Sequence, residues 1–359
     1  MNSKNIFTFT FVSLVTSMAF ASSINAQGFA TLRRGLKHHY KVGHIRIFYD
    51  TEGIHAVKPK DVNKNNVPDQ VEDLMSQTWC AHYIFVDTLG FPDPIKSERY
   101  QQAEYLDINF LAKKTLGLSG SAYDGLQRFR REIDDDETRA ICFDVGTNVT
   151  PNSNPTPTHE YFHLIQYSMT YFKPRWYLEG MARWSEHAVS KDGIGKTKYK
   201  GPWPHDQKGQ DDLFEMTYDT QYHLWNPLAR RIDKKGKIPV TEASKMARQM
   251  RYANGKQVLK DFKLNGAEFI KAVLVRLGKY DDIAKEELGF KTWAEKNQKS
   301  NENSPYIYKA VMDVAREHGQ DIGQFKIPGS KVETLDFSES KEADGDKSKT
   351  PKKKQATKQ

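Results

Sequence analysis

Two histidines four residues apart, with a glutamate next to the first, form the strongest chemical pattern in the sequence. His159 and His163 enclose Glu160 in a His-Glu-x-x-His segment. On a helix, residues i and i+4 lie on one face, so both imidazoles could reach one metal ion. Zinc accepts imidazole and carboxylate ligands, and Glu160 could take a proton from a zinc-bound water. The alternative is a surface helix with two solvated histidines.

A catalytic zinc ion needs a third protein ligand, and the next helix offers one. A third histidine in the metzincin pattern is excluded, because Gln166 and Met169 stand where that pattern needs Gly and His. Glu179 follows His163 after 15 intervening residues. Pro174 marks the place where the first helix must break, and the extended residues around it are long enough to return Glu179 to the metal.

Residues 158–187 resemble the gluzincin zinc metallopeptidases. The Glu-Gly-x-Ala run at Glu179, with Glu186 seven residues later, is most similar to the aminopeptidase branch. The wider arrangement is similar to poorly characterised secreted bacterial metalloproteases. The resemblance implies three zinc ligands and one general base: His159, His163 and Glu179, and Glu160. It also leaves two interpretations of Glu186, which either orients a histidine or is an ordinary solvated side chain.

The sequence departs from the family pattern in ways that matter for activity. It has no Gly-x-Met-Glu-Asn segment to bind a substrate amine, and Arg183 stands where thermolysin-like enzymes have an aspartate. Aminopeptidase activity therefore does not follow from the resemblance. Gluzincins also use a Tyr or His to stabilise the oxyanion of the transition state. The candidates after the zinc helices are His205, Tyr218, Tyr222 and His223, and we select Tyr222.

An acidic loop before the first long helix has the spacing of a calcium site. Oxygen side chains at positions 1, 3, 5, 9 and 12, with a backbone carbonyl at position 7, match an EF-hand-type loop. The expected ligands are Asp61, Asn63, Asn65, Val67 through its carbonyl, Asp69 and Glu72. Asn66 replaces the usual glycine at position 6, and Asn tolerates the left-handed turn. The alternative is an Asn/Asp-rich turn that caps the following helix. A second acidic run, 134–137, lacks ligand spacing and is expected to be a solvated turn.

The order of elements predicts an α+β fold with a small N-terminal sheet, a zincin-like helix carrying the histidines, and a mostly helical C-terminal half. Period-2 and period-3.6 apolar patterns distinguish the strands from the helices. The expected elements are strands at 44–50, 104–110 and 140–145, helices at 71–89, 158–172, 176–189 and 305–318, and a glycine-containing loop at 117–125. Phe162, Trp176 and Trp184 are expected to pack in the core around the two zinc helices.

The N-terminus has the layout of an export signal. Lys4 precedes an apolar run at 6–21 that ends in small residues, which favours cleavage after Ala26 over a membrane anchor. We expect a signal peptide at 1–26, an α+β region at 27–189, a mostly helical region at 190–332 and a disordered Lys-rich tail at 333–359. Export would place the protein in the periplasm or outside the cell. Cys80 and Cys142 would then either pair or remain buried thiols.

Composition excludes several classes of protein. Among 359 residues, 12% are aromatic, which argues against a wholly disordered chain. Half of the formal net charge of +8 comes from residues 341–359, so nucleic-acid binding is not expected. No later segment is apolar enough to span a membrane. The leading interpretation is a zinc metallopeptidase acting on peptides or proteins, and the alternative is a non-enzymatic calcium-binding envelope or adhesion protein.

Overall fold

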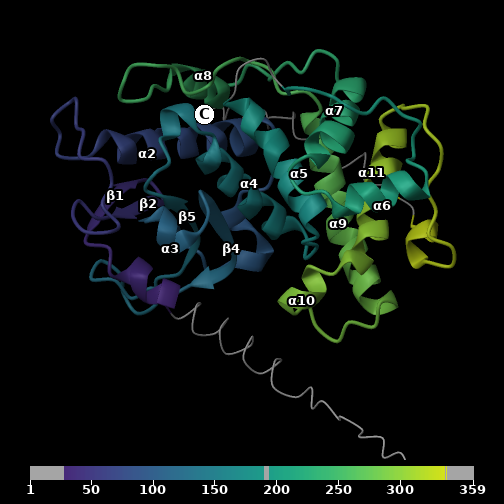
Figure 1. The fold of residues 1–359 in the computed structure, drawn as a ribbon, viewed down its shortest axis with the longest axis horizontal. Helices are drawn as coiled ribbons and strands as arrows, with labels where there is room; N and C mark the ends of the chain where they lie inside the picture. The colour runs from purple at the N-terminus through teal and green to yellow at the C-terminus, as the bar shows by residue number, and fades with distance from the viewer. Residues whose placement is uncertain (1–27, 190–193, 336, 338–359) are drawn as a thin grey trace, which may run out of the picture.

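The computed structural model describes residues 28–189, 194–335 and 337 of the chain (Figure 1). The expected signal peptide at 1–26 lies outside the described residues, as do 336 and 338–359 of the expected tail. The part of that tail next to the helical region packs against it. Glu333 lies 3.4 Å from Lys309, and the ring of Phe337 lies 6.2 Å from that of Tyr280. The boundary at 333 was therefore placed too early.

A five-stranded mixed sheet forms the N-terminal part of the fold. Its strands run in the order β1-β2-β3-β5-β4, with bounds His38–Val42, Ile45–Tyr49, Tyr105–Leu111, Ala140–Gly146 and Gly120–Gln127. Strands β2, β3 and β5 are parallel and almost wholly buried, whereas β1 and β4 pair antiparallel at the two edges. The strands predicted at 44–50, 104–110 and 140–145 are confirmed.

The glycine-containing segment at 117–125 was wrongly predicted to be a loop, because most of it belongs to edge strand β4. Every residue of β4 is half-buried. A strand with one buried and one exposed face shows alternating apolar and polar residues, and β4 lacks this alternation. Its pairing with β5 also shifts register between Tyr123 and Gln127. An edge strand of this kind is held by its neighbours more than by its own residue pattern.

Helices cover the sheet and make up the C-terminal half, which confirms the α+β prediction (Figure 1). The longer ones are α2 (Asp69–His82), α4 (Thr156–Met169), α5 (Arg175–Ser185), α9 (Ala267–Glu287) and α11 (Ser304–Glu317). The shorter ones are α3 (Lys113–Leu116), α6 (Gln207–Glu215), α7 (Asn226–Ile232), α8 (Glu242–Gln249) and α10 (Glu295–Gln298). A π-helical turn, Tyr83–Thr88, extends α2. In Figure 1, α4 and α5 lie between the sheet and the pair α9 and α11.

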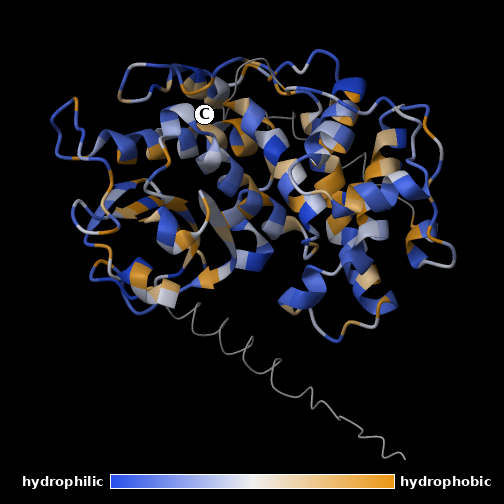
Figure 2. Cartoon of the chain, viewed as in Figure 1, coloured by the Kyte–Doolittle hydropathy of each residue, from blue (hydrophilic) through white to orange (hydrophobic). Residues whose placement is uncertain are grey.

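One apolar core joins the sheet to the helical half. Apolar residues of β2, α4, α5, α9 and α11 belong to a single cluster, and Figure 2 shows hydrophobic residues along the inner strands and helices. Phe162, Trp176 and Trp184 are fully buried in it, as predicted. Regions 27–189 and 190–332 therefore share their core, and the zinc helices lie where the two regions meet.

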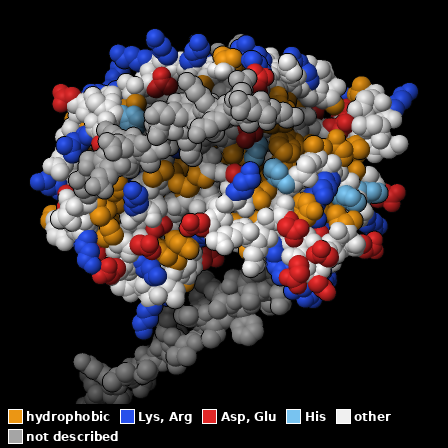
Figure 3. Space-filling view, turned by 180° about the vertical axis from the view of Figure 1, so that it is seen from behind, with side chains coloured by type: hydrophobic (Ala, Val, Ile, Leu, Met, Phe, Trp, Pro, Cys, Tyr) orange, Lys and Arg blue, Asp and Glu red, His pale blue; other side chains and the backbone are white. Residues whose placement is uncertain are grey.

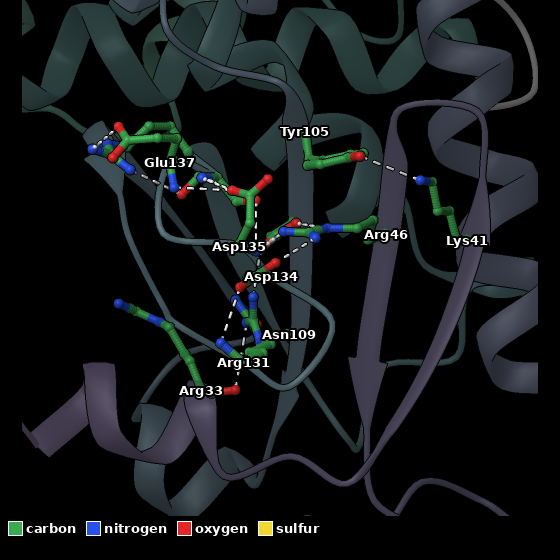
Figure 4. A network of polar contacts seen from close by, with 12 residues as sticks. Arg33, Lys41, Arg46, Tyr105, Asn109, Arg131, Asp134, Asp135 and Glu137 are labelled. Carbon is green, nitrogen blue, oxygen red and sulfur yellow. Dashed lines mark hydrogen bonds and ion pairs between the residues drawn. The ribbon is translucent and has the colours of Figure 1, made fainter.

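Charged groups are buried on one side of the sheet (Figure 4). Arg46 on β2 pairs with Asp107 and with Asp134, both at 2.7 Å, and Arg131 donates to Asn109 at 2.7 Å. The side chain of Asp134 is only 2% exposed, so its assignment to a solvated turn was wrong. Buried pairs of this kind fix the position of a loop more clearly than they add stability. Here they hold the loop before β5 against the sheet.

The surface carries mixed charge, and both cysteines are buried. No helix in the described ranges is long and apolar enough to cross a membrane. On the face shown in Figure 3, acidic, basic and apolar side chains are mixed, with Lys and Arg more frequent along the upper edge. Cys80 and Cys142 are buried and unpaired, and burial raises the pKa of Cys80 to about 12. Of the two alternatives for the cysteines, the structure has the buried thiols.

Candidate metal centre

Helix α4 presents both histidines from its N-terminal half. It begins after Pro155, and the side chain of Asn154 accepts a hydrogen bond from the Thr156 amide at 2.9 Å. The hydroxyl of Thr158 donates to the side-chain oxygen of Gln77 on α2 at 3.1 Å. These contacts fix the start of α4, so the i, i+4 face with the histidines points away from α2 and towards α5.

Helix α5 carries the third expected ligand, Glu179, and returns it to the two histidines. Pro174 precedes its first turn, as the sequence predicted, and Glu179 follows in its second turn. Gly180 allows close packing here, because a Cβ atom at this position would lie 1.7 Å from Oγ1 of Thr220. That hydroxyl donates to the carbonyl of Trp176 at 2.6 Å. The segment from 217 to 225 is thereby held against α5, beside the metal ligands.

The three expected zinc ligands meet. One ligand atom from each of His159, His163 and Glu179 lies within 4.8 Å of the others. Oε2 of Glu179 is 3.2 Å from Nε2 of His159 and 3.7 Å from Nε2 of His163. Ligand atoms about 2.0–2.1 Å from a tetrahedral zinc ion lie about 3.3 Å apart, so the spacing fits that ion. No other group of three or more His, Cys, Asp or Glu residues within the described ranges forms such a cluster.

The outer nitrogens of both histidines are also held. Nδ1 of His159 donates to Oε1 of Glu186 at 2.9 Å, and Nδ1 of His163 donates to Oε1 of Gln166 at 2.8 Å. Glu186 is buried, so it orients a histidine and is not the solvated residue of the alternative interpretation. Sequence reasoning missed the role of Gln166, although its i+3 spacing from His163 was a usable signal. Both contacts leave Nε2 to face the metal position.

The ligand cluster holds a proton when no metal is present. Burial lowers the pKa of His159, but hydrogen bonds to Glu179 and Glu186 outweigh it and raise the pKa to about 10. Burial raises the pKa of Glu179, but hydrogen bonds from His159 and His163 outweigh it and hold the pKa well below its usual range. A divalent cation would provide the positive charge that the proton provides here.

Glu160 lies against the edge strand β4. Its side chain is buried, and burial raises its pKa against the opposing effect of His159 and His163. A Cβ atom on Gly120 would lie 2.5 Å from Oε1 of Glu160, so only glycine lets β4 approach this carboxylate. The strand that the sequence did not predict therefore forms one wall of the site.

A cleft of about 480 Å³ opens beside these residues. Its walls come from 113–120, from 153–156, and from side chains of α4 and α5 that include Glu160 and Arg183. A second cavity of the same volume lies between α9 and α11, but its charged groups pair with one another, as Lys309 does with Asp313 at 2.9 Å. The candidate metal ligand His159 and the neighbouring Glu160 therefore mark the first cleft as the candidate site.

Tyr218 reaches this cleft, whereas the selected oxyanion residue Tyr222 does not line it. The ring of Tyr218 lies 6.2 Å from that of His159, and burial raises the pKa of its phenol. Tyr222 instead packs against Lys198, whose Nζ is 5.0 Å from the centre of its ring. The other candidates, His205 and His223, also do not line the cleft, and His205 bonds to Tyr308 at 2.8 Å.

The calcium-type loop is closed by its own side chains. Asp61 accepts hydrogen bonds from the amides of Lys64 and Asn66 at 2.8 and 2.9 Å, and Asn66 adopts the left-handed conformation with φ 66°. The side-chain amides of Asn63 and Asn65 donate to Glu72 at 3.1 and 2.7 Å. The remaining two expected ligands do not contact Glu72. The side chain of Asp69 accepts a hydrogen bond from the Val62 amide at 2.9 Å, and the Val67 amide donates to the side chain of Asn65 at 2.8 Å. The loop thus folds around the Glu72 carboxylate, with Asn63 and Asn65 exposed and Asp61 and Glu72 half-buried.

Searches against protein-family models, curated proteins and solved structures found no match to the chain.

Proposed function

We propose that the protein is an exported, zinc-dependent metallopeptidase that hydrolyses peptide bonds. The observation that carries the proposal is the meeting of His159, His163 and Glu179 within 4.8 Å, with His159 at the wall of a cleft. Two neutral imidazoles and one carboxylate leave a fourth position open on a tetrahedral zinc ion. The oriented histidines and the carboxylate of Glu160 at the same cleft support a catalytic role over a purely structural one.

Zinc, when bound, supplies a Lewis acid that activates water and polarises a carbonyl oxygen. Glu160 would accept the proton of the attacking water and pass it to the leaving amine. Burial raises the pKa of this carboxyl, which makes it a stronger base. Tyr218 would donate its phenolic hydrogen to the developing oxyanion, since its raised pKa keeps it protonated at neutral pH.

The edge strand supports a peptide as the substrate. β4 pairs with β5 on one side only, and its first residue, Gly120, lines the cleft next to Glu160. An exposed strand edge can pair with an extended peptide through main-chain hydrogen bonds. Such pairing would lay a polypeptide along the cleft, past the position of the metal.

Peptide cleavage by three forms of the purified protein tests this proposal. A peptide library or a mixture of denatured proteins is incubated with zinc-loaded wild type, Glu160→Gln and Glu179→Gln. Glu160→Gln cannot accept a proton, so it should keep zinc and lose activity by at least ~100-fold. Glu179→Gln should lose zinc, because a neutral amide is a poorer ligand.

Cleavage by Glu160→Gln at the wild-type rate would refute the assigned mechanism. If zinc-loaded wild type cleaves nothing across a broad library, the peptidase proposal fails and the non-enzymatic calcium-binding protein takes its place.

A further inference from the structure

An arginine in the cleft uses only part of its hydrogen-bonding capacity. Arg183 lies on α5 one turn after Glu179, and its Nη1 donates to Oε2 of Glu186 at 3.0 Å. Its buried Nε has no hydrogen-bond partner in the part of the chain that the structure describes. Buried donors without a partner are uncommon in folded proteins, so an acceptor from outside the chain, a water or a ligand group, would satisfy this one.

The unused edge of Arg183 is the one with which this protein binds carboxylates elsewhere. Arg33 holds Asp144 through Nε and Nη2, at 3.0 and 2.9 Å. Arg46 holds Asp107 through the same two nitrogens, at 2.7 and 2.9 Å. This two-pronged contact matches the geometry of a carboxylate. In Arg183 the bond to Glu186 takes Nη1, and neither Nε, which is buried, nor Nη2 bonds to a described residue.

Two contacts hold the guanidinium of Arg183 in position. The guanidinium carbon of Arg183 lies 4.8 Å from the centre of the Tyr218 ring, and Nη1 pairs with Glu186 at 3.0 Å. The side chain is still 39% exposed and lines the same cleft as Glu160. A guanidinium that is already oriented loses little conformational entropy when it binds a ligand.

Charge in the cleft also favours an anion. Lys113 lines the cleft, is exposed, and forms no ion pair within the described ranges. The acidic residues that line the cleft are Glu160 and Glu186, and Glu186 is already bound by His159 and Arg183. Lys113 therefore remains as the unpaired cation at the cleft wall among the described residues, beside the partly used guanidinium of Arg183.

We propose that the cleft binds a substrate carboxylate on the Nε–Nη2 edge of Arg183, with Lys113 adding positive charge at the wall. The inference rests on the proposed peptidase function and specifies its substrate class: peptides with a carboxylate close to the cleaved bond. That carboxylate comes either from an Asp or Glu side chain or from a free C-terminus.

The test measures binding without turnover. Fluorescently labelled peptides are titrated against zinc-loaded Glu160→Gln protein, and anisotropy gives the affinity. One set compares Glu with Gln at each position of the same peptide, and the other compares a free C-terminus with a C-terminal amide. At least one carboxylate peptide should bind ~10-fold tighter or more than its neutral partner, since a charge-assisted pair is lost in the latter. The set that shows the difference identifies the source of the carboxylate.

Added substitutions locate the effect. In the Glu160→Gln background, Arg183→Met should bring the affinity ratio close to one, and Lys113→Gln should lower it partly. Arg316→Met is the matched control, because Arg316 also pairs with an acid at i,i+3, is 42% exposed, and lies on α11 away from the cleft. It should leave the ratio unchanged. If Arg183→Met loses zinc, Arg183→Lys is used instead, since lysine can still pair with Glu186 but has no fork.

Equal affinity for carboxylate and neutral peptides, or a ratio that survives loss of the Arg183 fork, would overturn the proposal. Kinetics give a further check in wild type. Loss of the fork should raise KM for the carboxylate peptide alone, whereas a merely structural role would lower kcat for both peptides. Cleavage without any preference would refute the carboxylate site and leave the peptidase function intact. If the protein binds carboxylate peptides preferentially but zinc-loaded wild type cleaves no peptide, the carboxylate site stands and the peptidase function is refuted.

Discussion

The rings of His159 and His163 are oriented by neighbours that the three-ligand pattern does not contain. Each Nδ1 is fixed by an acceptor, Glu186 for the first and Gln166 for the second. Gln166 is in turn held by the carbonyl of Leu178, at 3.2 Å from its Nε2. A fixed ring and tautomer raise metal affinity, because the ligand does not have to be ordered on binding.

Removal of the Gln166 acceptor should weaken zinc binding. Gln166→Ala frees the ring of His163 to rotate, and we expect ~10–100-fold lower zinc affinity, the usual scale for such supporting contacts. Competition with a chromophoric chelator measures the affinity. Gln207→Ala, on an exposed part of α6, should behave as wild type, and wild-type affinity in Gln166→Ala would show that the contact does not support the metal.

At the scale of elements, the sequence predicted the strands and helices that are buried between other elements, because burial determines the spacing of their apolar residues. Strands β2, β3 and β5 lie in the middle of the sheet and carry apolar runs, and α4 and α5 carry a helical period. β1 and β4 were missed because an edge strand has one partner and mixed exposure. The wall that β4 forms at Glu160 depends on Gly120, whose role is visible only when the two elements meet.

The calcium-type loop precedes α2 and should stabilise it when calcium binds. The side-chain amides of Asn63 and Asn65 donate to Glu72, and rotation of these two side chains would turn their oxygens towards that carboxylate as calcium ligands. A ligand that binds only the folded state raises its stability by mass action, so millimolar calcium should raise the melting temperature by a few degrees. Differential scanning calorimetry measures the shift.

Asp61→Ala should abolish that shift. Magnesium at the same concentration is the control, since it prefers a tighter octahedral shell and keeps its waters. An unchanged melting curve for wild type at saturating calcium would favour the alternative of a helix-capping turn.

At the scale of the whole molecule, the two regions are joined around the turn between α4 and α5. Asp281 on α9 accepts hydrogen bonds from the Tyr171 amide at 2.8 Å and from the Thr170 hydroxyl at 2.9 Å. Burial raises the pKa of Asp281 to about 6, and these hydrogen bonds oppose the shift without cancelling it. The sequence could not predict this contact, because residues 170 and 281 meet only through the shared core.

The titration of Asp281 predicts a pH dependence of stability. Its pKa in the folded protein, about 6, lies above the ordinary value of 3.8, so the folded state binds the proton more tightly. The resulting stability is fully present below pH ~4 and is lost as pH rises through ~6, by up to about 3 kcal/mol. Chemical unfolding between pH 4 and 7 should show this decline in wild type.

Asp281→Asn should flatten that part of the pH profile, because its side chain can still accept the two hydrogen bonds but does not ionise. Asp212→Asn, on the exposed part of α6, should retain the wild-type slope. Identical slopes in wild type and Asp281→Asn would mean that another group controls stability in this range.

Metal content of the purified protein tests the central claim most directly. The protein is purified without chelators, reloaded with zinc, dialysed and examined by elemental analysis, with His163→Ala treated in parallel. We predict about one zinc per chain in wild type and none retained in His163→Ala, because two remaining ligands do not hold a catalytic zinc ion. Wild-type protein that stays free of zinc after reloading would contradict the metal centre and the function built on it.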